Sequence, residues 1–171
     1  LSAGADFVSV PVADRSADRS ADRREGRHVP ARLRITEIFL SLQGETSRVG
    51  LPTIFLRLTG CPLRCGYCDT AYAFNGGETL PLADVLARVD ALAGEPPQRA
   101  VHQVTVTGGE PLAQPAVHPL LTALCDGGYA VSLETGGALD VARVDPRVKK
   151  VVDLKTPGSG ECSRNLYANL A

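Results

Sequence analysis

The sequence lacks any long apolar run, has little charge imbalance and contains few cysteines, and each of these shortages excludes a class of protein. No stretch approaches the roughly 18 apolar residues that cross a bilayer, so we expect no membrane contact. The first 30 residues have no apolar centre of the kind found in signal peptides. A net charge of −1 argues against a nucleic-acid binder. Five cysteines are too few for a secreted disulfide scaffold, which predicts a cytoplasmic protein.

Methionine is absent too, and the chain begins with Leu1, so we expect it to be part of a longer protein. Residues 1–31 stand apart: positions 13–23 repeat Ala-Asp-Arg-Ser and offer no apolar face. Such a segment buries too little surface to offset the entropy lost on ordering, which predicts a disordered low-complexity tail. Residues 32–171 are long enough for one domain with its own core.

Apolar periodicity divides this domain into alternating strands and helices. Strands are predicted at residues 53–59, 101–106, 130–134 and 148–154, and helical spacing at 82–92 and 117–124. Alternation of this kind indicates βαβ units, and therefore an α/β fold with a parallel sheet.

One face of every predicted strand becomes polar toward its C-terminal end. Arg57, Thr107, Glu134 and Asp153 occupy such positions, opposite apolar neighbours in the same strands. Parallel strands are usually apolar on both faces, so we expect the polar face to enclose a wet or liganded space, as in a partial (β/α) barrel. The alternative is an uncovered sheet whose polar face meets solvent.

Three cysteines, Cys61, Cys65 and Cys68, follow the first predicted strand with the spacing Cys-x3-Cys-x2-Cys. Thiolates suit iron–sulfur clusters or zinc. Three ligands in one short loop would leave one iron of a four-iron cluster open to another ligand. A structural zinc site is the alternative, but it needs a fourth ligand. Cys125 and Cys162 lie far from the loop and are expected to be free thiols.

The cysteine loop, with Tyr67 before its last cysteine, resembles that of the radical S-adenosylmethionine (SAM) superfamily. Gly108-Gly109-Glu110-Pro111, after the second predicted strand, resembles the superfamily motif that holds the SAM amino group. The resemblance implies a 4Fe-4S cluster bound by the three cysteines and a partial (β/α) barrel of the radical SAM type. It also implies reductive cleavage of SAM to a 5′-deoxyadenosyl radical, which abstracts a hydrogen atom from the substrate.

Four separated segments resemble, more narrowly, the 7-carboxy-7-deazaguanine synthase family: residues 35–46, 55–57, 68–70 and 153–160. These lyases convert 6-carboxy-5,6,7,8-tetrahydropterin to 7-carboxy-7-deazaguanine with release of ammonia, a step of queuosine biosynthesis and purine metabolism. The family also implies further strand–helix units, so we expect the C-terminal part of the domain to be missing from this chain.

The same resemblance implies the following site residues. For SAM they are Tyr67, Cys68, Asp69, Gly109, Asp153, Leu154 and Lys155, and for the pterin Leu42, Gln43, Gly44, Arg57 and Thr107, with Thr70 as a Mg²⁺ ligand. Arg57 would meet the substrate carboxylate, the alternative being an internal ion pair with Glu134 or Asp153. Gln43 could instead be a loop amide facing water, and Asp69 and Thr70 could be helix caps.

The implied partners are the pterin and an electron donor such as flavodoxin or ferredoxin, and the implied assembly is a homodimer. Two other readings stay open. One is an activating protein for a glycyl-radical enzyme, which belongs to the same superfamily. The other is a non-catalytic module that binds an iron–sulfur cluster or zinc.

Overall fold

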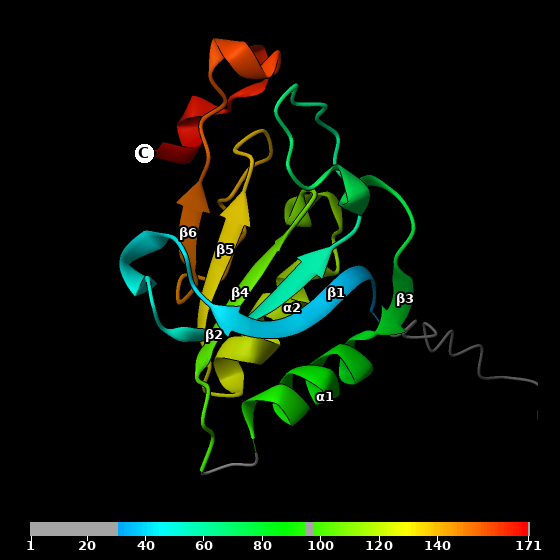
Figure 1. Cartoon of the computed structure of the whole chain (residues 1–171), viewed down its shortest axis with the longest axis vertical. Helices are drawn as coiled ribbons and strands as arrows, with labels where there is room; N and C mark the ends of the chain where they lie inside the picture. The colour runs from blue at the N-terminus through cyan, green and yellow to red at the C-terminus, as the bar shows by residue number, and fades with distance from the viewer. Residues whose placement is uncertain (1–30, 95–97, 171) are drawn as a thin grey trace, which may run out of the picture.

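The computed structural model describes residues 31–94 and 98–170, so the tail predicted for residues 1–31 lies outside the described residues except for Ala31. Within these ranges the strands form one six-stranded sheet in the order β3-β1-β2-β4-β5-β6 (Figure 1). The strand bounds are β1 Arg32–Leu42, β2 Pro52–Leu58, β3 Glu78–Pro81, β4 Gln103–Gly108, β5 Ala130–Thr135 and β6 Lys149–Val152. β2, β4, β5 and β6 are mutually parallel, whereas β1 is antiparallel to both β2 and β3.

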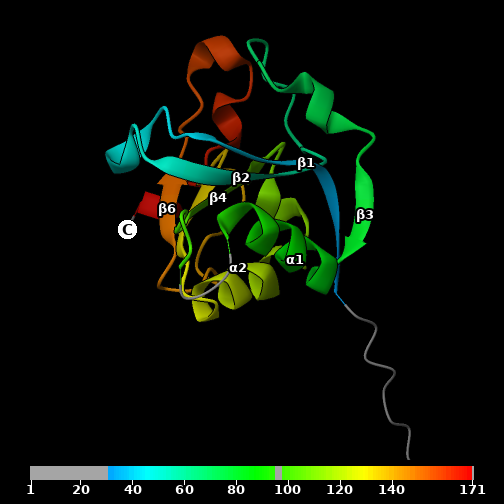
Figure 2. The same cartoon turned by 60° about the horizontal axis from the view of Figure 1, so that its bottom comes forward.

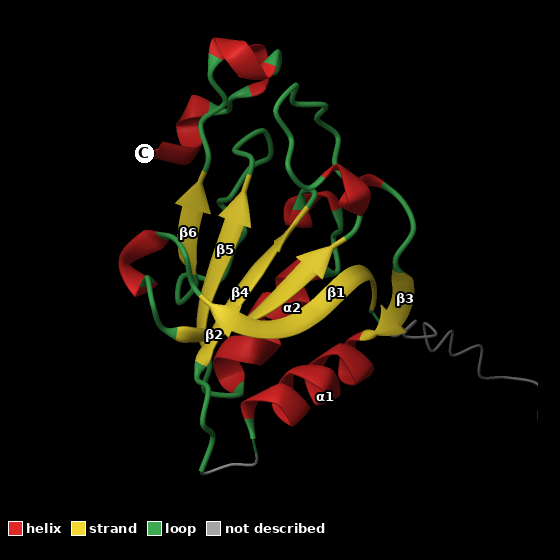
Figure 3. Ribbon diagram, viewed as in Figure 1, coloured by secondary structure: helices red, strands yellow, loops and turns green. Residues whose placement is uncertain are grey.

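Two α-helices, α1 (Leu82–Ala93) and α2 (Val117–Asp126), lie on one face of this sheet (Figure 2). Each has one buried stripe at helical spacing, with Val85 and Val89 in α1 and Leu120 and Leu124 in α2. Short 3-10 helices occupy the loops (Figure 3): η1 Thr46–Arg48, η2 Ala71–Phe74, η3 Pro111–Ala113, η4 Pro157–Ser159, η5 Cys162–Arg164 and η6 Tyr167–Leu170. No helix in the described ranges is both long and apolar enough to cross a membrane.

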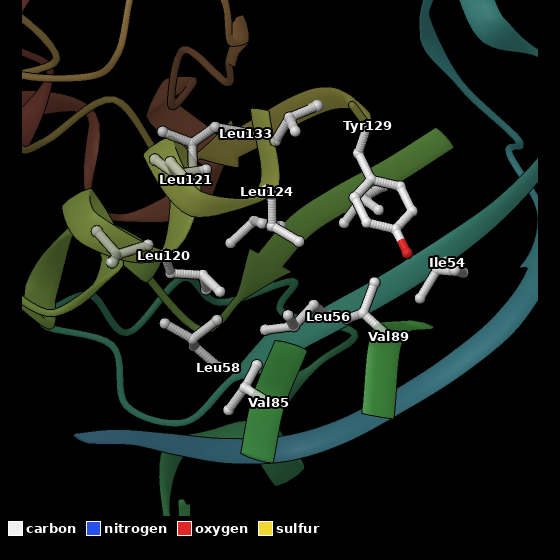
Figure 4. Packing of buried hydrophobic residues seen from close by; sticks show 14 of the residues in the cluster. Ile54, Leu56, Leu58, Val85, Val89, Leu120, Leu121, Leu124, Tyr129 and Leu133 are labelled. Carbon is white, nitrogen blue, oxygen red and sulfur yellow. The ribbon is translucent and has the colours of Figure 1, made fainter. Parts of the chain in front are cut away.

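The hydrophobic core lies between the helices and the sheet (Figure 4). Ile54, Leu56 and Leu58 of β2 are fully buried and face the helices, as the alternation of their strand predicts. Removing such a side chain, for example by Leu56→Ala, leaves a cavity that typically costs about 2–5 kcal/mol. This packed layer fixes the strands, so the opposite face of the sheet can carry polar groups.

The predicted α/β class, the four parallel strands and both helices are confirmed. β1 and β3 were not predicted as strands, and they add an antiparallel edge to the parallel sheet. The loops that follow β2, β4, β5 and β6 gather at one end of the sheet, the upper end in Figure 1. In parallel α/β sheets ligands bind beyond the carboxyl ends of the strands, so this end is where a site is expected.

β1 contains a β-bulge that changes which face its side chains occupy. Ile35 pairs with Leu58 and Glu37 with Arg57. Because Leu58 and Arg57 are consecutive in β2, Thr36 is an extra residue in β1 with no partner of its own. Ile35 is buried in the core, and regular alternation would send Glu37 to the same face. The bulge reverses this. Glu37 shares the polar face with Arg57, while Ile38, next along the strand, packs against the core.

Candidate active site

A cavity of about 540 Å³ opens at the carboxyl end of the parallel strands. Its wall contains Phe55 and Arg57 from β2, Thr107 from β4 and Glu134 from β5. Except for Phe55, these are polar residues on the face turned away from the helices, as the sequence pattern predicted. The polar residues therefore line a cavity and do not stand on a flat face of the sheet.

The three cysteines line the same cavity. Cys61, Cys65 and Cys68 are each half-buried, in a loop braced at its backbone: Gly60 N donates to Ala73 O (2.8 Å) and Gly66 N to Ser159 O (2.9 Å). These bonds connect the loop to η2 on one side and to η4 on the other. Cys125 and Cys162 are also unpaired thiols, and neither lines the cavity.

Arg64 stabilises the loop through hydrogen bonds to other residues of the same loop. Its guanidinium donates to the carbonyls of Cys61 (2.7 Å) and Leu63 (2.6 Å) and lies 4.4 Å above the ring centroid of Phe74. Its backbone N–H donates to Glu161 (2.6 Å). A loop restrained in this way loses less entropy when its thiols bind a rigid inorganic group.

The donor set fits a cluster better than a single ion. A zinc ion needs its ligands about 2.3 Å from one point. No three histidine, cysteine, aspartate or glutamate side chains in the described ranges come close enough together to hold one ion. Three thiols around one cavity wall instead suit a group large enough to meet each at a separate corner, as an iron–sulfur cluster does.

Gly108 and Gly109 allow the end of β4 to approach the cysteine loop. A Cβ at Gly108 would lie 2.5 Å from the carbonyl oxygen of Leu58, and one at Gly109 would press on Gly60 and Cys61. Both positions line the cavity. Glycine is therefore required here for close backbone packing, and it leaves backbone groups exposed to a ligand.

Glu110, the next residue of this motif, does not face the cavity. It is completely buried and accepts hydrogen bonds from Leu112 N (3.0 Å), Thr135 Oγ1 (2.9 Å) and Gly136 N (2.8 Å). Burial raises the pKa of its carboxyl, although these hydrogen bonds act in the opposite direction. Glu110 thus joins η3 to the end of β5, and the ligand-facing part of the motif is the glycine pair.

The other residues predicted to contact SAM lie mostly around the mouth of the cavity. Tyr67 lies within the cysteine loop and Asp69 directly follows it, and Asp153 and Lys155 follow β6 as an ion pair. Thr70 donates its hydroxyl to Asp69 Oδ1 (2.7 Å). Thr70 precedes η2 but makes no capping hydrogen bond through its side chain, so the capping alternative is not observed.

Most of the residues predicted to contact the pterin also line the cavity. Gln43 is buried, and its amide nitrogen donates to Thr105 Oγ1 (3.1 Å) and to Glu134 Oε1 (3.4 Å). It is therefore not an amide facing water. Gly44 and Thr107 also line the cavity.

Arg57 forms an ion pair, but with neither of the two partners considered from the sequence. Its Nε donates to Glu37 Oε1 at 2.7 Å. Burial alone would raise the pKa of Glu37, but the hydrogen bonds from Arg57 and Tyr72 outweigh burial and hold that pKa below its usual value. The carboxylate is therefore charged over most of the pH range in which the protein would be studied.

Two predicted residues are not part of the cavity lining. Leu42 and Leu154 are 64% and 40% exposed, and neither side chain contributes to the wall. Conversely, sequence reasoning did not assign Phe55, Phe74 or Glu37 to the site. Phe55 lies on the same strand face as Arg57, so period-2 alternation alone could have identified it. Roles for the individual lining residues stay predictions.

Comparison with known proteins defines the class of protein. The family model of the radical SAM superfamily matches residues 56–155, more than half of the chain and all of the cysteine loop. The chain therefore belongs to the radical SAM superfamily, and the class implies a 4Fe-4S cluster and SAM.

Individual relatives show which members of the superfamily the chain is similar to. The 7-carboxy-7-deazaguanine synthase of Chlorobaculum tepidum is 49% identical over 139 residues, which are 81% of this chain and 60% of that protein. The enzyme of the same name from Koribacter versatilis is 45% identical over 130 residues, 75% of this chain and 55% of that protein. The crystal structure of QueE from Escherichia coli matches with a TM-score of 0.67 and 28% identity, over 81% of this chain and 67% of that one. The chain thus spans little more than half the length of the curated relatives it matches.

Proposed function

We propose that this chain carries the radical SAM chemistry of a 7-carboxy-7-deazaguanine synthase. The reaction would convert 6-carboxy-5,6,7,8-tetrahydropterin to 7-carboxy-7-deazaguanine with loss of ammonia, in cytoplasmic 7-deazapurine (queuosine) biosynthesis. The observation that supports it most strongly is that Arg57 and the three cysteines line one cavity. An arginine there can receive a carboxylate close to the point where a radical would be generated.

Cys61, Cys65 and Cys68 would hold the cluster, which supplies, when bound, the electron that cleaves SAM to a 5′-deoxyadenosyl radical. The glycine pair at Gly108 and Gly109 offers backbone acceptors for the amino group of SAM. Tyr67, Asp69, Asp153 and Lys155 surround the remaining part of the mouth. These residues, which come from the cysteine loop and from the segments after it and after β6, would hold SAM.

The pterin would lie against β2 and β4. The guanidinium of Arg57 would bind its carboxylate through two parallel hydrogen bonds. Thr107 and the backbone of Gly44 would contact the ring, with Gln43 supporting the wall behind them. Phe55, stacked on Phe39 with 5.2 Å between ring centroids, offers a flat apolar surface beside these polar groups.

Four further parts of the proposal come from the family resemblance of the sequence: a Mg²⁺ site, the electron donor, the assembly and the extent of the domain. The Asp69–Thr70 pair provides oxygen atoms at the cavity, which suits Mg²⁺ completed by water and substrate oxygens. The electron donor would be a flavodoxin or ferredoxin, and the assembled enzyme a homodimer. The domain would extend over residues 32–171 of this chain.

The test is an anaerobic assay of the reconstituted, reduced protein with SAM and the carboxylated tetrahydropterin. Mass spectrometry should detect 7-carboxy-7-deazaguanine, and an ammonia assay should give one equivalent per product. Tetrahydropterin without its carboxylate serves as the control substrate. Cleavage of SAM that occurs equally with both pterins and yields no deazapurine would contradict the proposed substrate.

A further inference from the structure

Arg57 is held by a residue that is not part of the cavity wall. Glu37 lies behind it, and its Oε1 accepts the Nε hydrogen of Arg57 at 2.7 Å. The Arg57 side chain is 17% exposed and that of Glu37 37%. Within the described residues, the two terminal nitrogens of Arg57, Nη1 and Nη2, make no hydrogen bond to protein.

Tyr72 holds the carboxylate of Glu37 in turn. The Tyr72 hydroxyl donates to the same Oε1 at 2.8 Å, and the guanidinium carbon of Arg57 lies 5.9 Å from the centroid of the Tyr72 ring. Tyr72 belongs to η2, directly after the cysteine loop, whereas Glu37 belongs to β1. The three side chains therefore join β1, β2 and η2 at the cavity.

The bulge at Thr36 is what makes this contact possible. If the same residues alternated regularly, without a bulge, Glu37 would share the helix-covered face with Ile35, where an unpaired carboxylate would be strongly destabilising. A side chain of Gln114 secures the backbone on the N-terminal side of the bulge, because it bonds to Arg34 N (2.8 Å), Arg34 O (2.9 Å) and Thr59 O (2.9 Å). Bulges of this kind commonly re-aim a side chain near an active site.

We propose that Glu37, supported by Tyr72, is a positioning residue: it holds Arg57 through Nε so that Nη1 and Nη2 are presented together to a ligand carboxylate. This inference rests on the proposed function, because it concerns how that function's substrate is selected. A guanidinium fixed at Nε has lost its free rotation before the ligand arrives. Less entropy is then lost when the two parallel hydrogen bonds form.

Glu37 could also have the opposite effect and weaken binding of the ligand carboxylate. Glu37 carries a negative charge beside Arg57, so it partly neutralises the attraction of the site for an anion. If charge dominated, removing the carboxylate would tighten binding of a carboxylated ligand. If positioning dominates, removing it weakens binding, and a neutral acceptor at the same place restores it.

Equilibrium binding of 6-carboxypterin, followed by its fluorescence in the reconstituted chain with SAM, separates the two effects. Pterin without the carboxylate is the control ligand. We expect Glu37→Ala to weaken binding of 6-carboxypterin about tenfold, with unchanged binding of pterin. Glu37→Gln keeps an acceptor for Nε and should stay within about threefold of the parent. Tyr72→Phe should produce a smaller loss than Glu37→Ala, again only for the carboxylated ligand.

Glu78→Ala is the matched control, because Glu78 forms an ion pair with Arg88 (2.9 Å) on the surface and is not part of the cavity. Substrate-free SAM cleavage reports whether each variant is folded around its cluster. Unchanged or tighter binding of 6-carboxypterin by Glu37→Ala, or equal losses for both ligands, would overturn this inference but not the proposed function. A parent protein that does not prefer 6-carboxypterin over pterin would instead overturn the proposed function, and the inference with it.

Discussion

At the scale of single residues, the three cysteines are the most consequential prediction. Each of the single variants Cys61→Ala, Cys65→Ala and Cys68→Ala should fail to bind the cluster, since the loop has no other thiol to replace the missing ligand. Cys125→Ala and Cys162→Ala should retain the iron, because neither residue lines the cavity. Iron analysis and the visible absorbance of the reconstituted variants measure this. Retention of a four-iron cluster by a variant lacking all three loop cysteines would refute the assignment.

Arg57 tests the substrate wall separately from the cluster. Arg57→Lys replaces a planar fork with a point charge and loses the Nε bond to Glu37. We expect at least about a tenfold loss in kcat/KM for the carboxylated pterin, with substrate-free SAM cleavage nearly unchanged. Equal losses in the two reactions would indicate that Arg57 only supports the fold.

Glu110 should stabilise the protein in a pH-dependent way. Glu110→Gln places an amide nitrogen against backbone N–H donors, so the free energy of unfolding should fall by about 2 kcal/mol or more. Because the pKa of Glu110 is raised by folding, the folded state binds its proton more tightly, and the stability that Glu110 gives falls as pH rises above about 4.5. The difference between parent and variant should therefore be largest near pH 4 and smaller at neutral pH. Urea unfolding at several pH values checks this, and a constant difference would contradict it.

At the scale of secondary structure elements, the parallel strands and helices could be predicted from the sequence because their apolar patterns are regular. β1 could not, because the bulge at Thr36 shifts its alternation by one residue and conceals the period of two. β3 has four residues, too few for a pattern. The wall positions of Arg57 and Thr107 follow from strand alternation, but the Glu37–Arg57 pair depends on the bulge, which no local pattern indicates.

The C-terminal 3-10 segments brace the cysteine loop, and this contact can be tested. Glu161 accepts from Arg64 N at 2.6 Å, next to the bond between Gly66 N and Ser159 O. A Glu161→Ala variant should still form the cluster, but its cysteine loop should open more often. We expect a chelator to remove iron about three times faster than from the parent. The exposed Asp84→Ala variant in α1 is a control, and equal rates for all three proteins would show that the contact does not restrain the loop.

At the scale of the whole molecule, the sheet has an edge at β6. Within the described residues β6 pairs only with β5, and Lys149 and Lys150 are exposed on it. Lysine on an edge strand opposes pairing between chains, since pairing would bring like charges together. Lys150→Val should therefore increase association at high protein concentration, measured by size-exclusion chromatography with light scattering. The same elution for parent and variant would show that this edge is already protected.

The whole architecture places three thiols and a clamped arginine at one cavity, so the central claim is that this cavity holds a SAM-binding iron–sulfur cluster. The most direct measurement is the iron and sulfide content of the anaerobically reconstituted chain, combined with the EPR spectrum of the reduced protein before and after SAM is added. We predict about four irons and four sulfides per chain, and a spectrum that changes on addition of SAM because three thiolates would leave one iron free to bind it. A chain that binds one zinc in place of iron, or whose cluster spectrum is unaffected by SAM, would contradict the account.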